Sequence, residues 1–414
     1  MGINVLKFGG TSVGSPERIK KVAKIIYDTQ KNTGNQVVVV VSAMGHTTDE
    51  LIDLAKQVSD VRNTREMDML LATGEQVSIA LVSMALHNLG AKAVSLTGFQ
   101  ANIKAEQVYS KARILEIETQ RMKELLDQGN ILIVAGFQGV AENTEIVTLG
   151  RGGSDTTAVA LAASLNADVC EIYTDVDGVY TADPRLVPDA KKLKEISYEE
   201  MLELASLGAQ VLHPRAVECA ASYDTIIHVR STFTGNVGTF VKGVDSLEVK
   251  NAISGVAIDK NQAKVALLEV PDQPGMAAGL FTAIAEKGYV VDMIIQSVKE
   301  TETNDIAFTV ARDDVKEVEE IAKDIAKKYN CKNVVVEENV AKVSIVGAGM
   351  VGRPGIAAGM FKALGDAGIN IQMISTSEIK VSCIVNLDEC ENAARVIHKA
   401  LISELEEEKQ FSRA

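Results

Sequence analysis

The chain has 414 residues, enough for two or three domains, and 46% of them are hydrophobic. Trp is absent and aromatic residues account for 4%, so aliphatic side chains must build the core. The net charge of −14 disfavours nucleic acids and acidic membranes as partners. No apolar run approaches the roughly 20 residues of a membrane span; no signal-peptide pattern and no C-x-x-C pair occurs. We therefore expect a reduced, cytoplasmic protein that binds neither nucleic acid nor membrane.

Residues 1–240 alternate predicted strands and helices. Val37–Val41 is a β-branched run, typical of a strand buried on both faces, and Ser15-Pro16 is typical of a helix start. The alternation indicates an α/β fold in three layers, a mostly parallel sheet covered by helices on both faces. The other predicted strands are Asn4–Phe8, Ala93–Leu96, Ile131–Ala135, Glu145–Thr148, Val169–Thr174 and Ile226–Val229. The other predicted helices are Leu51–Val58, Met67–Leu89, Glu116–Gln128 and Thr156–Leu165.

An internal repeat follows Lys242. Pro274–Phe281 matches Pro354–Phe361, 80 positions later (354 minus 274), and the match continues without a gap to Met293-Ile294 and Met373-Ile374. Each copy reads strand, glycine loop, helix, strand, strand, helix. This order is typical of the ferredoxin-like βαββαβ unit.

The second copy lacks a fourth strand, because only a charged tail follows its last helix, predicted at about Glu391–Glu404. A bare sheet edge is usually covered, and Ala252–Ile258 is an apolar strand without another assignment. We predict that Ala252–Ile258 pairs with Lys342–Val346 and completes the second unit, with the first unit inserted in it. The predicted domains are 1–245, 263–337, and 251–260 plus 341–414.

The first chemical motif is Lys7–Ser12, Lys-Phe-Gly-Gly-Thr-Ser, at a strand–helix junction. Gly9 and Gly10 let the backbone approach a ligand, with their N–H groups pointing at it. Lys7 adds a positive charge, so the junction suits an anion. The spacing is not that of a Walker loop, and an ordinary glycine turn is the alternative.

The second motif, Leu149–Ala158, places an Arg-Gly-Gly-Ser-Asp run before a predicted helix. The planar fork of Arg151 fits a carboxylate or phosphate bidentately. The glycines and Ser154 expose N–H donors at the positive end of the helix dipole. The alternative is that Ser154 or Asp155 only caps the helix.

The third motif, Tyr173–Arg185, leaves a strand at Thr174 and opens into a loop rich in Asp, Gly and Tyr. Ligands of α/β sheets bind at this end of the strands. Tyr180 is suited to face an adenine ring, and Arg185 to reach a phosphate. The Asp spacing does not satisfy the EF-hand pattern.

With these motifs the chain resembles the aspartate kinases, amino-acid kinases with two C-terminal ACT domains, over essentially its whole length. Val-Ser-Ala-Met-Gly at 41–45, Thr-Thr-Asp-Glu-Leu at 47–51 and Ala-Thr-Gly-Glu at 72–75 also match, and Gly-Ala-Gln-Val-Leu-His-Pro-Arg at 208–215 matches less completely. The resemblance implies transfer of the γ-phosphoryl group of ATP, with Mg²⁺, to the side-chain carboxylate of L-aspartate. This would be the first step toward lysine, threonine and methionine, under feedback control.

The resemblance also assigns roles to residues. Lys7 and Asp155 are the expected catalytic residues, with Asp155 orienting the lysine or an Arg151 donor. A carboxylate acceptor is already ionised at pH 7, so no general base is required. The expected ATP-binding residues are Lys7, Phe8, Gly9, Gly10, Ser42, Thr174, Asp175, Tyr180 and Arg185. The expected substrate-binding residues are Thr48, Glu75, Arg151, Gly152, Gly153 and Ser154, with Glu75 contacting the ammonium group.

Some of these residues have structural alternatives. Glu75 lies in an apolar helix, where a structural ion pair is the alternative to substrate binding. For Thr48, the alternative is a structural role near the N-cap of the next helix. We expect His213, followed by Pro214, to be structural. Gln210 replaces a lysine that many family members place near the nucleotide, which leaves that contact in doubt but not the reaction.

Gly347–Gly352 satisfies the dinucleotide-binding pattern G-x-G-x-x-G, but Gln372 stands where the acidic residue is needed. The resemblance instead implies small-amino-acid sites in the ACT units, for lysine and/or threonine. The expected effector-binding residues are Asp272, Asp292 and Gln296 in the first unit, and Ile356, Ala357, Asn370, Ile371, Ser377 and Glu378 in the second. The two copies differ, since Asn370 corresponds to Val290. The alternative is that the repeats only dimerise.

We expect a homo-oligomer joined through the ACT domains. Two other functions stay open: an amino-acid kinase acting on glutamate or a nucleotide, and a non-catalytic amino-acid sensor. The ACT pair counts against the first, and intact Lys7, Glu75, Arg151 and Asp155 count against the second. The sequence leaves open which effector binds, whether the oligomer is a dimer or a tetramer, and whether a separate short regulatory chain exists.

Overall fold

The computed structural model describes residues 2–59, 63–209, 211–243, 252–297 and 303–403. The chain divides into two compact units. Unit 1 comprises Met1–Val179, Lys192–Ser206 and Gln210–Leu247, and unit 2 comprises Tyr180–Lys191, Leu207–Ala209 and Glu248–Ala414. Part of the third motif therefore packs with unit 2.

Unit 1 is built on an eight-stranded sheet with the order β10-β12-β11-β9-β1-β2-β6-β3. Its strands run parallel except for the β11–β12 pair, which is antiparallel. This mostly parallel sheet was predicted. The strands are β1 (Ile3–Phe8), β2 (Gln36–Val41), β3 (Ala93–Leu96), β6 (Ile131–Ala135), β9 (Val169–Thr174), β10 (Glu195–Ser197), β11 (Ile227–Ser231) and β12 (Thr239–Lys242).

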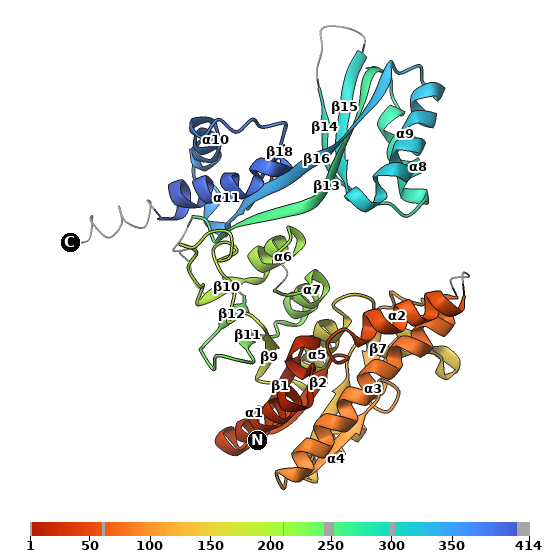
Figure 1. Cartoon of the computed structure of the whole chain (residues 1–414), viewed down its shortest axis with the longest axis vertical. Helices are drawn as coiled ribbons and strands as arrows, with labels where there is room; N and C mark the ends of the chain where they lie inside the picture. The colour runs from red at the N-terminus through yellow and green to blue at the C-terminus, as the bar shows by residue number, and fades with distance from the viewer. Residues whose placement is uncertain (1, 60–62, 210, 244–251, 298–302, 404–414) are drawn as a thin grey trace, which may run out of the picture. The chain divides into compact units, whose positions relative to one another are not determined.

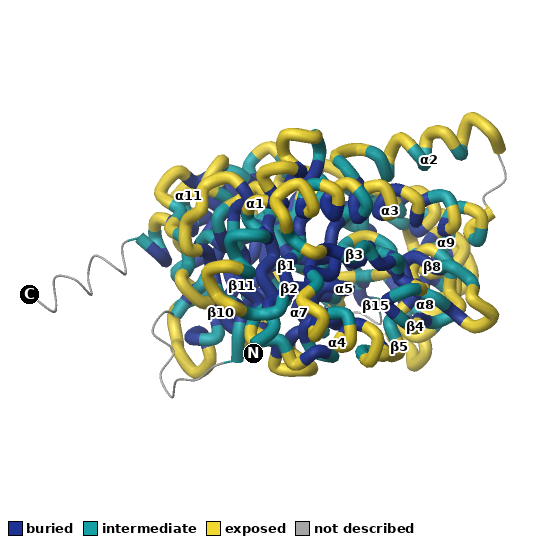
Figure 2. Tube along the Cα trace, turned by 90° about the horizontal axis from the view of Figure 1, so that it is seen from below, coloured by how far each residue is buried: buried dark blue, intermediate teal, exposed yellow. Residues whose placement is uncertain are grey.

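Helices cover this sheet. One face, with the buried side chains Leu6, Phe8 and Val39, packs against apolar residues of α1 and α3, and α5 packs against β1, β2 and β9. Ser15 caps α1 by accepting a hydrogen bond from the Arg18 N–H, as predicted. The helices are α1 (Pro16–Thr33), α2 (Thr47–Val58), α3 (Thr64–Asn88), α4 (Gln120–Asp127), α5 (Gly153–Leu165), α6 (Tyr198–Ser206) and α7 (Pro214–Tyr223). Figure 2 shows the buried trace of β1 and β2, and α2, which has no buried residue.

A second, four-stranded sheet in unit 1 was largely missed by the sequence analysis. Its order is β5-β4-β7-β8, and it supports a small core of Ala105, Ala112, Ala141, Val147 and Leu149. The prediction of helix from Glu116 was wrong at its start, because residues 114–117 pair with β4 as an edge strand. The strands are β4 (Ile103–Ala105), β5 (Ile114–Ile117), β7 (Gln138–Val140) and β8 (Ile146–Thr148).

Helix α3 is long and apolar enough to cross a membrane by length and composition alone, contrary to the expectation from the sequence. Half of its apolar window is buried inside the protein. Leu71, Glu75, Ile79, Val82 and Leu86 are buried at spacings of three or four residues, which is the pattern of a helix packed on a core. We interpret α3 as a core helix that carries buried polar residues.

Unit 2 contains a six-stranded antiparallel sheet with the order β14-β15-β13-β16-β18-β17. Its two long central strands, β13 (Gly255–Pro271) and β16 (Asn333–Val346), are visible in Figure 1. The predicted pairing is confirmed, because residues 255–258 lie opposite residues 343–346. The segment is continuous with the first strand of the first repeat, which the sequence analysis had treated as separate, and residues 252–254 precede the strand.

Each repeat has the predicted ferredoxin-like arrangement, with two helices on its half of the sheet. Helices α8 and α9 pack on the first core, and α10 and α11 on the second. The last helix ends at His398 and continues as a π-helical turn, while Glu404 lies outside the described residues. The remaining elements are α8 (Met276–Glu286), β14 (Val291–Gln296), β15 (Thr303–Val310), α9 (Val315–Lys328), α10 (Ile356–Asp366), β17 (Met373–Thr376), β18 (Lys380–Asn386) and α11 (Cys390–His398).

Candidate active site and effector pocket

The carboxyl ends of three neighbouring strands meet in unit 1. Phe8, the last residue of β1, is in register with Val41 of β2 and Tyr173 of β9. The segments that follow these strands therefore share one edge of the sheet, where α/β proteins bind ligands. Gly10 approaches Ala43 closely, since a Cβ on Gly10 would lie 2.8 Å from the Ala43 carbonyl oxygen. The first motif and the Val-Ser-Ala-Met-Gly segment are thus packed together.

Lys7 and Asp155 form an ion pair at this edge. The Lys7 Nζ lies 2.6 Å from Asp155 Oδ1, and the two side chains are 12% and 13% exposed. The same ammonium group lies 3.4 Å from the position of a Cβ on Gly9. The structure therefore places a partly buried positive charge beside the glycine turn, paired with the Asp155 carboxylate.

Helix α5 begins at Gly153, and Gly152 is its N-cap in a left-handed conformation with φ of 70°. No side chain caps the helix. The alternative in which Ser154 or Asp155 serves as the N-cap is therefore wrong. Both residues lie in the first turn, where unpaired N–H groups and the helix dipole favour an anion.

Arg151 is exposed in the turn just before α5. The next residue, Gly152, is packed against the ring of His213, since a Cβ there would lie 2.0 Å from the ring. The His213 Nδ1 accepts a hydrogen bond from the Arg215 N–H, 3.3 Å away. Burial lowers the pKa of His213, which favours the neutral ring. The imidazole fits the structural role expected for it, as a surface for the Arg151 turn.

Glu75 is 3% exposed on α3. Its Oε1 accepts a hydrogen bond from the Ala43 N–H at 3.2 Å, while its buried Oε2 has no hydrogen-bond partner among the described residues. Burial raises the pKa of Glu75 to about 7, against the opposing effect of backbone hydrogen bonds. No ion pair of Glu75 is present in the described chain, so the structural alternative for this residue is not supported. A buried acceptor without a partner is costly unless a ligand satisfies it.

Ser42 and Thr48 follow β2 on the same side of the sheet. The Ser42 N–H donates to the Phe8 carbonyl oxygen at 3.1 Å, which holds it beside the first motif. Thr48 is the second residue of α2 and is half-buried. Its position in the first turn of α2 agrees with substrate binding and also with a structural role at the helix start.

The residues expected to bind the nucleotide differ in which of their groups can face it. Phe8 is fully buried and its ring stacks on Tyr173, with 4.6 Å between centroids, so only its main chain can face a ligand. Thr174 ends β9, and its hydroxyl donates to the Asp175 carboxylate at 3.0 Å. Tyr180 and Arg185 belong to unit 2, where Arg185 pairs with Asp183 at 2.7 Å.

A buried polar cluster that no sequence pattern predicts surrounds Glu171 of β9. Glu171 accepts hydrogen bonds from His228 (3.3 Å), Arg230 (2.9 Å) and Tyr173 (2.9 Å). Burial by itself would raise the pKa of Glu171, but the His228 hydrogen bond and the Arg230 charge outweigh it and lower the pKa. His228 and Arg230 lie 57 and 59 residues after Glu171 in the chain, so no local motif indicates that they are its partners.

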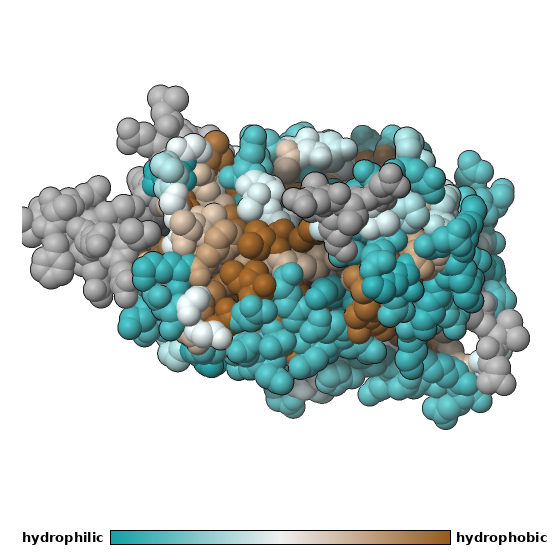
Figure 3. Space-filling view, turned by 90° about the horizontal axis from the view of Figure 1, so that it is seen from above, coloured by the Kyte–Doolittle hydropathy of each residue, from teal (hydrophilic) through white to brown (hydrophobic). Residues whose placement is uncertain are grey.

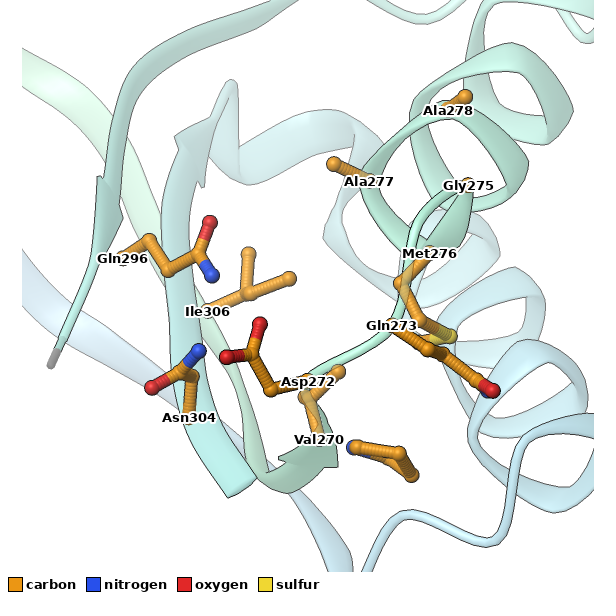
Figure 4. A pocket seen from close by; sticks show the side chains of 11 residues that line it. Val270, Asp272, Gln273, Gly275, Met276, Ala277, Ala278, Gln296, Asn304 and Ile306 are labelled. Atoms are coloured by element: carbon orange, nitrogen blue, oxygen red, sulfur yellow. The ribbon is translucent and has the colours of Figure 1, made fainter. Parts of the chain in front are cut away.

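Unit 2 has a pocket of about 140 Å³ at the start of α8. Figure 4 shows the polar groups of Asp272, Gln296 and Asn304 turned toward one another, with Met276 and Gln273 on the other side. Two of the expected effector residues, Asp272 and Gln296, thus lie together, and Asn304, which no sequence pattern pointed to, lines the same pocket. The volume is well below the roughly 300–1,000 Å³ of drug-sized sites.

Asp292 does not line this pocket. Its carboxylate pairs with the ammonium group of Lys342, a buried residue of β16 in the other repeat. In the second copy, Ile356 begins α10, Asn370 lies between α10 and β17, and Ser377 follows β17 with its N–H donating to the Lys380 carbonyl oxygen. Ala357 and Ile371 pack against the second core, and Glu378 is exposed. Gln210 lies outside the described residues.

Comparison with known proteins agrees with this geometry. The model of the amino acid kinase family matches residues 2–231, and two ACT domain models match residues 264–328 and 343–401. The chain belongs to the amino acid kinase family. An aspartokinase of Geobacillus stearothermophilus is 52% identical to this family member, over 97% of each chain.

Solved structures of this family are also similar. The crystal structure of aspartate kinase from Synechocystis is 51% identical over 96% of this chain and 69% of that one, with a TM-score of 0.54. The structure of E. coli aspartokinase III in complex with aspartate and ADP is 25% identical, covers 96% of this chain and 99% of that one, and has a TM-score of 0.80. The same enzyme in complex with lysine and aspartate has a TM-score of 0.75, at 25% identity, covering 97% and 99%.

Proposed function

We propose that this chain is an aspartate kinase, which transfers the γ-phosphoryl group of ATP to the side-chain carboxylate of L-aspartate and forms 4-phospho-L-aspartate. The motifs for this chemistry run through the family domain, and relatives of about 50% identity are named aspartokinase over nearly their full length. The product is the activated acid from which lysine, threonine and methionine synthesis begins.

The Lys7–Asp155 pair beside the glycine turn carries the proposal. Phosphoryl transfer to a carboxylate brings one anion onto another, and catalysis is mostly positioning and charge stabilisation. Lys7, the N–H group of Gly10 and the N-terminus of α5 supply positive potential where charge spreads over the transferred group. The Gly9 N–H, expected from the sequence to face the ligand, instead donates to the Tyr173 carbonyl oxygen at 3.4 Å. Asp155 keeps the ammonium group aimed at this place.

Arg151 and Glu75 are the proposed contacts to aspartate. The Arg151 fork suits one carboxylate of the substrate, while Glu75 Oε2, which is buried and lacks a hydrogen-bond partner in the described chain, suits the ammonium group. Ala43 links the two halves of the site, because its N–H donates to Glu75 and its carbonyl oxygen packs against Gly10. The amino acid would thus lie beside the phosphate turn.

We propose ATP with Mg²⁺ as the phosphoryl donor. Glycine residues beside Lys7 let phosphate oxygens approach the main chain closely. Mg²⁺ is usually held through substrate phosphates and a few carboxylates, and it neutralises the charge that develops on them.

We further propose that the α8 pocket of unit 2 binds an inhibitory amino acid, lysine or threonine. Asp272 is suited to an ammonium group, and the amides of Gln296 and Asn304 to a carboxylate or hydroxyl. The lysine complex of E. coli aspartokinase III supports an amino-acid effector for this family. The second copy has Gly352 and Thr376 in place of Asp272 and Gln296.

A segment of the third motif offers a route for inhibition. Within unit 2, the Thr181 hydroxyl lies 2.8 Å from Nε2 of His398 on α11, and the Thr181 carbonyl oxygen accepts from the Val256 N–H at 2.8 Å. Ala182 and Val187 are buried in the core of the second repeat. Tyr180 follows directly on Val179 of unit 1, so we propose this junction of the main chain as the route between the second repeat and the expected nucleotide loop.

We propose a homo-oligomer joined through the ACT units. Strands β14 and β17 are the two edges of the six-stranded sheet, and each pairs on one side only within the described chain. Ile294 and Ile374, at equivalent positions of the repeats, are 53% and 41% exposed on these edges. Figure 3 shows apolar areas, coloured brown, among the polar surface. The domain limits 1–245, 263–337, and 251–260 plus 341–414 are retained as a proposal, and residues 244–251 and 404–414 lie outside the described chain.

The proposal is tested by assaying the whole chain for amino-acid-dependent ADP formation, with the acyl phosphate trapped by hydroxylamine as the hydroxamate. We expect kcat/KM for L-aspartate to exceed that for L-glutamate at least 100-fold, since a site that pairs buried polar groups rejects a misfit strongly. A preference for glutamate, or the absence of turnover with every amino acid, would overturn it.

A further inference from the structure

A buried carboxylate on α3 fastens the segment that leads to the Arg151 turn. Asp68 is fully buried, and no cation pairs with it in the described chain. Its oxygens accept hydrogen bonds from the main-chain N–H groups of Ser110 (2.9 Å) and Thr148 (2.7 Å). They also accept from the hydroxyls of Ser110 (3.2 Å) and Thr148 (2.9 Å). Such a carboxylate fixes the groups that bond to it, because leaving them unpaired in the interior is costly.

Thr148 is the last residue of β8, so Asp68 holds the chain three residues before Arg151. A second charged residue acts one position later. Arg215, at the start of α7, donates to the Leu149 carbonyl oxygen at 2.5 Å and to the Ala112 carbonyl oxygen at 2.9 Å. The beginning of the turn is therefore held by side chains from two helices.

Ser110 connects this network to the turn itself. Gly150 has φ of 77°, and a Cβ on it would lie 2.9 Å from the Ser110 carbonyl oxygen. The Ala112 N–H donates to the Thr148 carbonyl oxygen at 3.0 Å, which ties the 110–112 segment to β8. Asp68 thus organises both the strand that enters the turn and the backbone that packs against it.

We propose that Asp68 and Arg215 are positioning residues for the amino-acid substrate, acting through the backbone of the Arg151 turn. This inference rests on the proposed function of Arg151. The Arg151 side chain is exposed, so the main chain decides where its fork can reach. A displacement of about 1 Å in a positioning group can cost about 100-fold in rate. The first motif leaves β1 and makes none of these contacts in the described chain, so ATP should be affected less.

The first test compares Asp68→Asn with a matched control on the same helix. The amide keeps the shape but removes the negative charge that strengthens these hydrogen bonds. If its oxygen faces the Thr148 N–H, its NH₂ group faces the Ser110 N–H, which also donates to Oδ1 at 3.1 Å and loses that acceptor. We expect KM for aspartate to rise about 10-fold or more, with KM for ATP changed less than about twofold. Ser83→Ala, which removes a buried α3 hydroxyl that has no partner in the described chain, should change neither. Equal changes in both KM values, or none, would overturn the proposal.

Hydrogen exchange provides a readout that does not depend on the reaction. In Asp68→Asn, amides of residues 147–155 should exchange faster, while those of residues 4–14 stay as in the wild type. Unchanged exchange at residues 147–155 would overturn the positioning role even if the wild type phosphorylates aspartate. If the wild type does not, but exchange responds as expected, the proposed function fails and the network is upheld. Should Asp68→Asn not fold, Thr148→Val, which removes a single hydroxyl donor, takes its place with an expected rise of about threefold in KM for aspartate.

Discussion

The candidate active site of unit 1 and the α8 pocket of unit 2 differ in how deeply their charged groups are buried. Lys7, Asp155 and Glu75 are 12%, 13% and 3% exposed. Lys7 and Asp155 pair with each other, and Glu75 accepts a hydrogen bond from the Ala43 N–H. Of the three polar side chains that face one another in the α8 pocket, Asp272 and Gln296 are exposed and Asn304 is buried. A buried charge interacts strongly because the surrounding dielectric is low, and water cannot take its place after a substitution. At an exposed position, water can replace the lost interaction. Substitutions in unit 1 should therefore have large effects, and those in the unit 2 pocket modest ones.

Lys7→Ala should have the largest effect. The ammonium group lies beside the glycine turn, where charge develops on the transferred phosphoryl group. Loss of one such group typically costs about 10²–10³ in kcat. Steady-state ADP formation measures this, with Lys24→Ala, which breaks an exposed ion pair with Asp28, as the control. A Lys7→Ala enzyme within about threefold of the wild type would remove Lys7 from the catalytic machinery.

Glu75→Gln should raise KM for aspartate about 10–100-fold, because a neutral amide replaces a charged acceptor for the ammonium group. In the wild type, KM for aspartate should rise as the pH falls through about 7, where Glu75 is protonated. That pH dependence should be absent in the variant. A wild-type KM that stays flat between pH 6 and 8 would contradict the assignment.

The same residue predicts an effect on stability with a defined sign. The pKa of Glu75 in the folded chain is raised from 4.5 to about 7, so the folded state binds more protons than the unfolded state between these values. Its contribution to stability therefore falls as the pH rises from about 4.5 to 7. Glu75→Gln should increase Tm relative to the wild type at pH 8 and change it little at pH 4.5. A Tm difference that is independent of pH would count against the buried, unpaired carboxylate.

Arg151→Lys should weaken aspartate binding about 10-fold and ATP binding less, because lysine cannot supply the bidentate fork. The KM values of the two substrates, measured separately, decide this. If KM for ATP rises instead, Arg151 contacts the nucleotide and the assignments of the two substrates must be exchanged.

Asp272→Ala should have the smallest effect, since its carboxylate is exposed. We expect the concentration of lysine or threonine that gives half-inhibition to rise about 5–10-fold, which is the loss of one hydrogen bond to a charged group in contact with water. Asp366→Ala, on the corresponding helix of the second copy, where Asp366 pairs only with Lys362 in the described chain, is the control. If both substitutions change the half-inhibiting concentration equally, the proposal that the α8 pocket of the first repeat binds the effector is contradicted.

The sequence predicted the features that depend on local patterns. Alternation of β-branched runs with apolar helices indicated the parallel sheet, and the repeat at 274 and 354 led to the pairing of residues 255–258 with 343–346. The second sheet was missed because strands such as Ile103–Ala105 have only three residues, too few for a period to be recognised. The N-cap alternative was wrong because α5 begins at Gly153 with Gly152, at positive φ, as its N-cap, so Ser154 and Asp155 already lie in the first turn.

The buried polar network was beyond the sequence for a different reason. Asp68 lies seven residues before Glu75 and thus on the same face of α3, which is a usable signal for a second buried acid. Its partners, Ser110 and Thr148, are 42 and 80 residues away, so nothing local connects them. Asp292 was assigned to the effector site by resemblance, but its partner Lys342 comes from the other repeat, 50 residues later.

A crystal structure of the whole chain with L-aspartate and ADP is the most direct test of the central claim. The account predicts the aspartate ammonium group within hydrogen-bond distance of Glu75 Oε2, a substrate carboxylate paired with Arg151, and the nucleotide phosphates at Lys7 and the Gly9-Gly10 turn. Aspartate bound elsewhere, with Glu75 Oε2 still buried and unpaired, would contradict it.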